Sequence, residues 1–234
     1  MSLEKQGKDS LQKKTLSIAA KNLRLSVLIA FAINSWWIIT QLYAVSSIST
    51  EMIAWVGLSF SLLLFLPLMF APFILLCSLI GLIFKKSRET SAFIATYSLV
   101  FLLTGIISIT ISEKIRHNAF VKLANDSSVL IEAIKQYEEQ RGVAPETLEN
   151  LVPDFLPSIP TTGIGAYPIY KYYRCEKADQ TEKGCFHNPW YLQVDTSSGI
   201  LSFDIFIYLP KQNYPESGYG GNLERIEDWA YVHE

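Results

Sequence analysis

Residues 91–141 read SAFIATYSLVFLLTGIISITISEKIRHNAFVKLANDSSVLIEAIKQYEEQR. The first part, Ser91–Ser112, is 22 residues long and contains no ionisable side chain, whereas the second part mixes charged and apolar residues with a helical period. About 20 apolar residues are enough for a helix to cross the hydrocarbon core of a bilayer. The stretch therefore predicts a helix that spans a membrane and continues, without a break, as an amphipathic helix outside it.

Two more apolar stretches precede this one, Leu25–Val45 with 21 residues and Ile53–Phe84 with 32. Each is long enough to span a bilayer as a helix. The second contains Pro67 and Pro72 near its middle and is too long for a straight span, so we expect it to be kinked or tilted. The three stretches contain no Asp, Glu, Lys, Arg or His, which argues against a transporter or channel.

The orientation follows from the distribution of lysine and arginine. Residues 1–24 contain six of them, the first connector Ser46–Met52 contains none, and the second connector contains three. This pattern predicts a bacterial inner-membrane protein with a cytoplasmic basic N-terminus (1–24), a three-helix anchor (25–112) and a periplasmic domain (113–234). Lys114, Arg116 and Lys122 oppose it more weakly. A signal peptide cleaved near Ala44-Val45-Ser46 is an alternative for the first stretch that leaves the side of the domain unchanged.

The charge of the chain divides at the same boundary. Residues 1–112 have a net charge of +5 and residues 113–234 a net charge of −7, although the whole chain has only −2. An acidic domain without a basic stripe is a poor binder of nucleic acid. The expected partners are therefore the lipid bilayer and another envelope protein.

The outer domain begins with an apolar stripe on the helix Glu113–Arg141, and Gly142 is its expected end. The stripe consists of Phe120, Leu123, Leu130, Ile134 and Tyr137. The proline-containing passage Ala144–Pro160 follows, with a short helix expected over Glu146–Leu151.

Three strands are expected after this passage, at Tyr167–Arg174, Trp190–Thr196 and Ile200–Leu209. They predict a three-stranded antiparallel meander. In the last strand, Leu201, Phe203, Ile205, Ile207 and Leu209 would form the apolar face that packs against the helix stripe. The predicted fold class is a membrane protein with three transmembrane α-helices and an α+β extracytoplasmic domain.

Cys175 and Cys185 flank a polar loop, and outside the cytoplasm such a pair indicates a disulfide. The alternative is a metal site made by these cysteines with His187, but the spacing is not that of a zinc motif. Cys77, inside the second span, is expected to be a packing residue.

The outer domain resembles the type IV pilin-like fold, most closely the major pseudopilin of type II secretion. The resemblance covers about residues 90–210 and lies in a helix ending YEEQRG (137–142), in Pro145, and in the segment LVPDFLPSIP (151–160) before a tyrosine-rich strand. It implies a long helix packed on an antiparallel sheet. The chain departs from the family because Gly105 is followed by Ile106-Ile107-Ser108-Ile109-Thr110, without the phenylalanine and glutamate of a prepilin cleavage site, and because the calcium loop is not matched. Fibre assembly and calcium binding are therefore not implied.

No catalytic, cofactor-binding or metal-binding residue is predicted, since His117, His187 and His233 lie outside known catalytic motifs. The tail from Pro210 offers candidate partner-binding aromatics, which alternatively fold back to cover the sheet: Tyr214, Tyr219, Trp229 and Tyr231. We expect a non-enzymatic protein that displays its periplasmic domain for protein–protein contact, as an accessory or scaffold component of an envelope or secretion assembly. The alternatives are an immunity-type protein that neutralises a toxin and, from a different class, an envelope enzyme.

Overall fold

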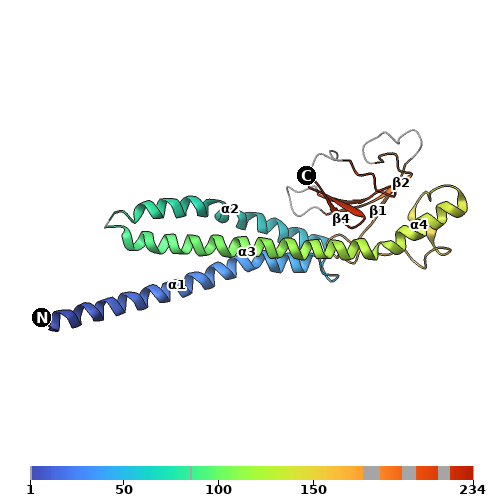
Figure 1. The fold of residues 1–234 in the computed structure, drawn as a ribbon. Helices are drawn as coiled ribbons and strands as arrows, with labels where there is room; N and C mark the ends of the chain where they lie inside the picture. Colours follow the sequence, from blue (N-terminus) through green and yellow to red (C-terminus); the bar gives the residue numbers. More distant parts are fainter. Residues whose placement is uncertain (1, 85, 176–184, 197–203, 216–221, 234) are drawn as a thin grey trace. The chain divides into compact units, whose positions relative to one another are not determined.

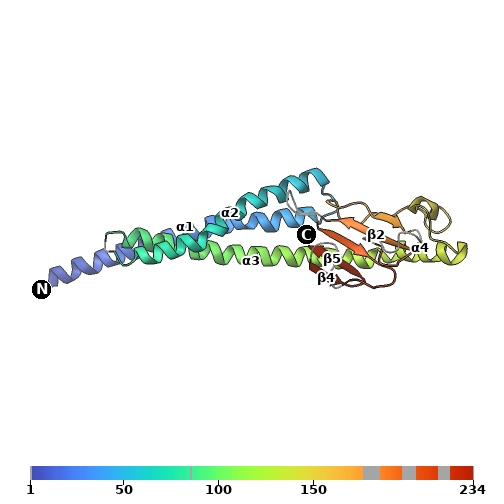
Figure 2. The same ribbon diagram turned by 90° about the horizontal axis from the view of Figure 1, so that it is seen from above.

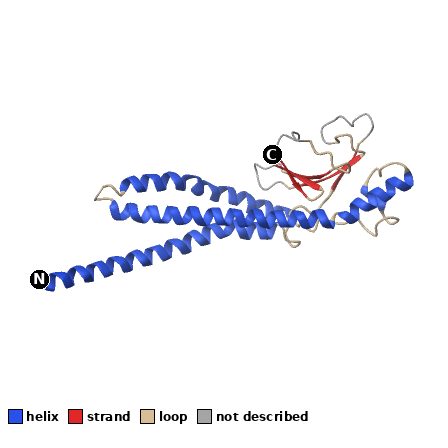
Figure 3. Cartoon of the chain, in the orientation of Figure 1, coloured by secondary structure: helices blue, strands red, loops and turns tan. Residues whose placement is uncertain are grey.

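The computed structural model describes residues 2–84, 86–175, 185–196, 204–215 and 222–233 (Figure 1). The chain divides into two compact units. We call Met1–Ile39 with Phe60–Ser112 the helical unit, and Thr40–Ser59 with Glu113–Glu234 the α+β unit. Figure 3 shows that all strands lie in the second unit.

Three long helices account for the apolar half of the chain: α1 (Ser2–Ala44), α2 (Glu51–Gly81) and α3 (Arg88–Asp126). Each contains a segment that is long and apolar enough to cross a membrane, beginning at Leu23, Met52 and Arg88 respectively. The three predicted apolar helices are therefore present. Helix α1 starts at Ser2, so the basic N-terminal segment is helical as well, and Pro67 and Pro72 both lie inside α2.

The helical unit is held together by small and polar contacts rather than by a large core. Ala30, Leu68, Ala71 and Phe101 form its buried cluster. The side-chain amide of Asn34 donates hydrogen bonds to the Thr104 hydroxyl at 2.8 Å and to the Phe101 carbonyl at 3.2 Å. Large apolar side chains cover the exterior, among them Phe31, Phe73 and Ile106. Interhelical amide bonds and an apolar exterior are typical of helices packed in lipid.

In the α+β unit, the end of α3 is followed by α4 (Ser128–Arg141). The prediction of one unbroken helix is therefore wrong, because the helix is interrupted at Ser127. The Ser127 hydroxyl donates a 2.7 Å hydrogen bond to the Ala124 carbonyl. A serine that bonds to its own helix in this way commonly perturbs it. Helix α4 ends as expected at Gly142, which has a left-handed conformation with φ of 73°. The short helix expected over Glu146–Leu151 is a single 3₁₀ turn, η1 (Leu148–Leu151).

The sheet has five antiparallel strands in the order β1-β2-β3-β5-β4, rather than the three strands that were predicted (Figure 2). They are β1 (Lys171–Arg174), β2 (Trp190–Asp195), β3 (Ile205–Tyr208), β4 (Asn222–Ile226) and β5 (Trp229–His233). The predicted meander corresponds to β1, β2 and β3, and the tail adds a hairpin. The turn of this hairpin is Glu227-Asp228, where Glu227 has a φ of 53°. Tight hairpin turns usually carry Gly or Asn, so residues 227 and 228 do not match the usual sequence pattern of a turn.

One face of the sheet packs against α3 and α4. The Phe120 and Phe206 rings stack with their centroids 5.1 Å apart, and Ile134 is fully buried. The sheet contributes Trp190, Leu192, Val194, Phe206, Tyr208, Trp229 and Tyr231 to this core. The helix stripe is therefore confirmed.

The face of the third strand was assigned wrongly. Leu192 pairs with Tyr208 and Val194 with Phe206, and paired residues share a face, so Phe206 and Tyr208 point to the helix. Ile207 and Leu209 lie on the opposite face in a second buried cluster with Ala230 and Val232, and Ile205 packs against that cluster. Leu201 and Phe203 lie outside the described residues. Both faces of the sheet therefore carry a buried cluster, whereas we had predicted only one buried face.

The connector between α1 and α2 is part of the α+β unit. The amide of Gly165 donates to the Ser46 carbonyl at 3.0 Å, and that of Ala166 donates to the Ala44 carbonyl at 3.3 Å. A Cβ atom at residue 165 would lie only 2.3 Å from the Ser49 carbonyl oxygen. Only glycine allows this close approach of two backbones. The domain that begins at Glu113 thus has a further segment, residues 40–59, packed with it.

Candidate functional site

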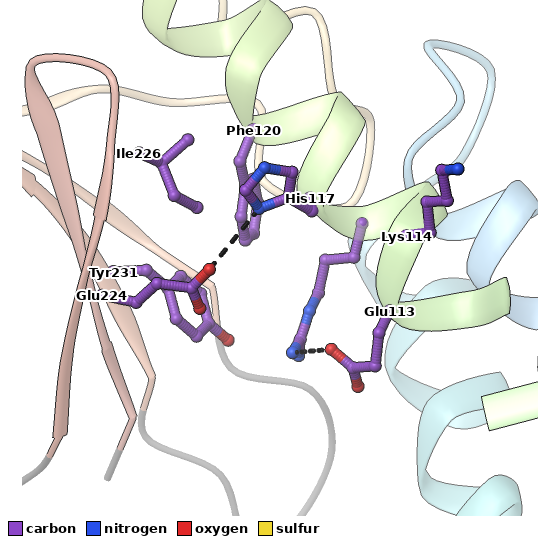
Figure 4. Close-up of a pocket in the computed structure, with 8 residues that line it drawn as sticks. Glu113, Lys114, His117, Phe120, Glu224, Ile226 and Tyr231 are labelled. Atoms are coloured by element: carbon purple, nitrogen blue, oxygen red, sulfur yellow. Dashed lines mark hydrogen bonds and ion pairs between the residues drawn. The ribbon is translucent and has the colours of Figure 1, made fainter. Parts of the chain in front are cut away.

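A pocket of about 330 Å³ lies in the α+β unit, between the turns of α3 from Glu113 to Phe120 and the strands β4 and β5 (Figure 4). Helix α3 contributes five lining residues from consecutive turns, and Figure 4 shows that the side chain of one of them, Lys114, points away from the sheet. The sheet supplies the facing wall. The described lining residues are Glu113, Lys114, Arg116, His117 and Phe120 from α3, Glu224 and Ile226 from β4, and Tyr231 from β5.

The inner wall of the pocket is apolar and fixed by the core. Phe120 and Tyr231 are each 1 % exposed, and their ring centroids lie 5.2 Å apart. Ile226 is buried beside them in the same core cluster. Figure 4 shows Phe120 and Ile226 pointing toward one another from helix and strand. Because these side chains belong to the core, the inner wall keeps its shape only while the sheet is docked on the helix.

Arg116 connects the pocket to a buried polar network. Its guanidinium lies 5.1 Å from the centroid of the Tyr231 ring, and its Nη2 donates a 2.5 Å hydrogen bond to Glu113 Oε2. The Tyr231 hydroxyl donates in turn to Asp204 Oδ2 at 2.6 Å. Desolvation lowers the pKa of Arg116, but the attraction of Tyr231, Glu113 and Asp204 outweighs it and holds this pKa above its ordinary value. Arg116 is therefore a permanent cation at the base of the pocket.

Two tyrosines beside Arg116 are held in the neutral form. Burial raises the pKa of Tyr231, and the hydrogen bond to Asp204 raises it further against the opposing charge of Arg116. Burial also raises the pKa of Tyr167 to about 12. The Tyr167 hydroxyl is buried and has no hydrogen-bond partner among the described residues. The network thus contains one donor whose desolvation is not compensated.

Glu224 faces two histidines from different elements. Its Oε1 lies 3.5 Å from His117 Nδ1, and its Oε2 lies 3.4 Å from His233 Nε2. Figure 4 shows the His117 side of this arrangement across the pocket mouth. Both distances are at the long limit of hydrogen bonding. The carboxylate is half exposed, so it can accept a shorter hydrogen bond from a donor that enters the pocket.

The lining as a whole suits binding of a small molecule that carries both charges. It combines the cation Arg116 with the anions Glu113 and Glu224 above an apolar wall, while the Lys114 side chain points to the other side of α3. Among the described lining residues there is no serine, threonine or cysteine, and the one hydroxyl, that of Tyr231, is already bonded to Asp204. The pocket is therefore better suited to binding a charged ligand than to nucleophilic catalysis.

The predicted disulfide is confirmed, since Cys175 and Cys185 are bonded to each other. The alternative metal site with His187 is excluded, because both sulfur atoms are used in the bond. Within the described ranges, no group of three or more potential metal ligands is found. Cys77 is a free thiol exposed on the surface of α2, so it does not pack inside the helical unit as we expected.

The described candidate partner-binding aromatics, Tyr214, Trp229 and Tyr231, are used within the domain and do not form a free binding surface. Trp229 and Tyr231 are 0 % and 1 % exposed and belong to the core under the helices. The Tyr214 hydroxyl accepts from the Leu209 amide at 2.9 Å and donates to the Asp228 carbonyl at 2.7 Å, while Arg225 covers its ring. These three residues hold the tail on the sheet, and Tyr219 lies outside the described residues.

The sequence did not reveal the pocket because its two walls are separated by about 110 residues in the chain. One signal was available. Lys114 and Arg116 oppose the overall distribution of positive charge, directly after the third apolar stretch. Cations placed against that distribution are candidates for a specific role. His117, Glu224 and His233 had no such signal, since their proximity depends on the unpredicted hairpin.

No protein-family model matches the chain, and no curated protein or solved structure matches it either.

Proposed function

We propose that the chain is a bacterial inner-membrane protein that holds a periplasmic α+β domain close to the membrane as the binding part of an envelope assembly. The observation that carries this proposal is α3, which includes both the third apolar stretch and the residues Phe120 and Leu123 of the domain core. No linker separates anchor from domain. A domain whose core includes residues of the spanning helix itself is suited to remaining at the membrane.

Two observations support the proposed side of the membrane. The disulfide Cys175–Cys185 is of the kind that persists in an oxidising compartment. The first connector, which has no lysine or arginine, is bonded to the domain through Ser46 and Gly165. A connector and a domain that share one side agree with three spans and a cytoplasmic N-terminus.

The pilin-like resemblance remains part of the proposal. It is supported by the apolar stripe packed on an antiparallel sheet, and by the burial of Leu148, Leu151 and Leu156 in the proline-containing passage. Two additional apolar helices precede the pilin-like helix. We therefore favour an accessory component that remains in the membrane over a subunit that is drawn out into a fibre.

The surface for a partner is proposed at the edge strand β1. Ile169 is 65 % exposed just before this strand, and Tyr173 is exposed within it, where its ring stacks on Tyr191 with centroids 4.6 Å apart. Exposed aromatic and aliphatic side chains of this kind contribute strongly to protein interfaces. The remaining aromatics of the sheet are needed in its two cores.

The test combines topology and contact in intact cells. A reporter that is active only in the periplasm, fused after Glu234, should be active. A photo-crosslinking residue at Ile169 or Tyr173 should capture one defined envelope protein, whereas the same residue at the exposed Lys135 on α4 should not. Activity of a cytoplasm-only reporter at the C-terminus would contradict the topology. Equal capture from all three positions would contradict the β1 surface.

A further inference from the structure

Strand β1 lies at one edge of the sheet, and one of its sides has no neighbouring strand among the described residues. We propose that the partner contributes an extended segment that adds to β1 as a further antiparallel strand, with an aromatic side chain opposite Tyr173 and a carboxylate opposite Arg174. The inference rests on the proposed function, because it names the kind of partner that the β1 surface accepts. Unpaired amides and carbonyls at a sheet edge are a template for such a strand.

The hydrogen bonds between β1 and β2 show which backbone groups point out of the sheet. The Cys175 amide donates to the Pro189 carbonyl at 2.9 Å, and this pair extends the register of β1 and β2 by one residue. In an antiparallel ladder, pairs that exchange hydrogen bonds alternate with pairs whose amides and carbonyls point away. Tyr173, two residues earlier, therefore bonds to β2. The amides and carbonyls of Tyr172 and Arg174 point instead to the open edge.

The pairing of β2 with β3 leads to the same result independently. The Thr196 amide donates to the Asp204 carbonyl at 2.9 Å, which extends the register of these two strands by one residue. Alternation along β2 then directs the backbone groups of Leu192 toward β3. Leu192 is the partner of Tyr172, so the backbone groups of Tyr172 point away from β2. Within the described part of the chain, the amides and carbonyls of Tyr172 and Arg174 have no hydrogen-bond partner.

The side chains beside the open edge favour an aromatic residue in the added strand. Tyr173 and Tyr191 are paired across β1 and β2, their ring centroids lie 4.6 Å apart, and Tyr173 is exposed. A strand added next to β1 places one of its side chains beside Tyr173 and can extend this stack by one ring. Ile169, exposed just before β1, is available to an aliphatic side chain farther along the segment.

The charge of β1 favours an acidic segment over a second copy of this chain. The strand reads KYYR and contains no acidic residue. Lys171 is paired with Asp195 on the neighbouring strand. The contact between Arg174 and Glu146 is looser, since it measures 3.6 Å and the Glu146 side chain is 83 % exposed. A carboxylate opposite Arg174 can therefore form a closer ion pair, whereas a second β1 would bring two more cations to the edge.

The experiment uses the full-length protein in detergent and a synthetic peptide with this pattern, acetyl-Ser-Glu-Tyr-Thr-Thr-Thr-Val-amide. In antiparallel pairing, its glutamate lies opposite Arg174, its tyrosine opposite Tyr173 and its valine opposite Ile169. Amide hydrogen exchange is measured residue by residue with and without the peptide. The amides of Tyr172 and Arg174 should exchange about tenfold more slowly with saturating peptide, because each gains an acceptor. The Tyr173 amide, already bonded to β2, should exchange slowly in both states. Unchanged exchange at Tyr172 and Arg174 would overturn the proposal.

Two N-methylated peptides test the direction of the new hydrogen bonds. Methylation of the glutamate nitrogen removes an amide that faces β1, so binding should weaken about tenfold. Methylation of the tyrosine nitrogen, which faces away from β1, is the matched control and should leave the affinity of the peptide unchanged. Equal losses from the two methyl groups would contradict strand addition.

Substitutions at Arg174 separate the backbone contribution from the charge. Arg174→Pro and Arg174→Ala both remove the cation, but only proline also removes the amide that faces the peptide. Proline is tolerated on edge strands, and slow exchange of the Tyr173 amide is the check that β1 stays paired. The proline variant should bind the peptide about tenfold more weakly than the alanine variant. Equal affinities of the two variants would refute the role of this amide.

A dilution series distinguishes the partner segment from a second copy of the chain. Protection of the Tyr172 and Arg174 amides that grows with protein concentration, without peptide, would assign the edge to self-pairing and overturn the proposal. The proposed function fails differently, by the wrong reporter signal or by equal capture from all three positions, and neither result affects peptide binding in detergent. If Ile169 and Tyr173 capture a protein in cells but the peptide protects no amide, only strand addition fails.

Discussion

The indole N–H of Trp229 donates a 3.0 Å hydrogen bond to the hydroxyl of Ser127, and this contact joins residues 102 positions apart. Ser127 lies at the junction of α3 and α4, and Trp229 opens β5. Both residues are fully buried. The helix interruption and the unpredicted hairpin therefore meet at one hydrogen bond. Ser127, which perturbs the helix, also accepts the indole N–H of Trp229 in the hairpin.

This contact predicts that Ser127→Ala lowers stability by about 1–3 kcal/mol, because the buried indole N–H loses its acceptor. Trp229→Phe also removes the bond but leaves no unpaired indole. The measurement is the midpoint of thermal unfolding of the full-length protein in detergent. Ser128→Ala, exposed and one residue later, is the matched control and should be neutral. Equal midpoints for the two alanine variants would contradict the role of this bond.

The helix stripe predicts that Ile134→Asp unfolds the α+β unit. The side chain is 0 % exposed, and an unpaired carboxylate at this position costs several kcal/mol. Limited proteolysis of the full chain should show rapid cleavage between β1 and β5. Val129→Asp, on the exposed side of the same helix, should leave the digestion pattern unchanged. Resistance of Ile134→Asp would show that the stripe is not needed to hold the sheet.

The disulfide predicts that substitutions of Cys175 and Cys77 have different effects on the stability of the α+β unit. Cys175→Ser should destabilise the α+β unit by about 3 kcal/mol, the loop-closure term for a bridge with a sequence separation of 10. Cys77→Ser should have no effect on this unit, because Cys77 is free and lies on α2. Thermal unfolding with and without a reductant provides the measurement. A midpoint that does not depend on the reductant would contradict this expectation.

The close approach at Gly165 predicts that Gly165→Ala releases the connector from the domain. The new Cβ would meet the Ser49 carbonyl, which is backbone and cannot move aside cheaply. The amides of Gly165 and Ala166 should then exchange with deuterium several-fold faster. Gly57→Ala, whose Cβ would meet only ordinary contacts with Thr40, is the control. Unchanged exchange in Gly165→Ala would mean that the backbones are not joined in solution.

The buried tyrosines predict a loss of stability at alkaline pH. Burial raises the pKa of Tyr167 and of Tyr191 to about 12, above the ordinary value of about 10. A raised pKa in the folded state means that the stabilisation is complete below pH 10 and is lost as the pH rises toward 12. Unfolding midpoints measured from pH 8 to 12 should fall most steeply above pH 10. A flat profile would contradict these shifts.

Tyr167→Phe offers a control for this pH dependence. It removes a buried hydroxyl without a partner in the described residues, so the midpoint at pH 8 should rise and the alkaline decline should become shallower. A lower midpoint at pH 8 would show that the hydroxyl makes a compensating hydrogen bond.

Features that depend on composition and local periodicity could be predicted from the residues alone. Three uncharged stretches of sufficient length indicated three long apolar helices, and the spacing of Phe120, Leu123, Leu130 and Ile134 identified the face of the helix that packs on the sheet. Gly142 ended the helix where a left-handed residue was required. The cysteine pair with a short loop between its members was enough to predict the disulfide.

Features that depend on contacts between distant residues could not be predicted in this way and became visible in the folded chain. The face of β3 was set by pairing with β2, because a shift of one residue exchanges Phe206 for Ile207. The β4–β5 hairpin turns at Glu227, which carries no glycine signal, and it alone brings Glu224 to His117. The pocket depends on both events. Its residues are ordinary surface charges in the sequence, and docking of the sheet on the helix is what gathers them at one place.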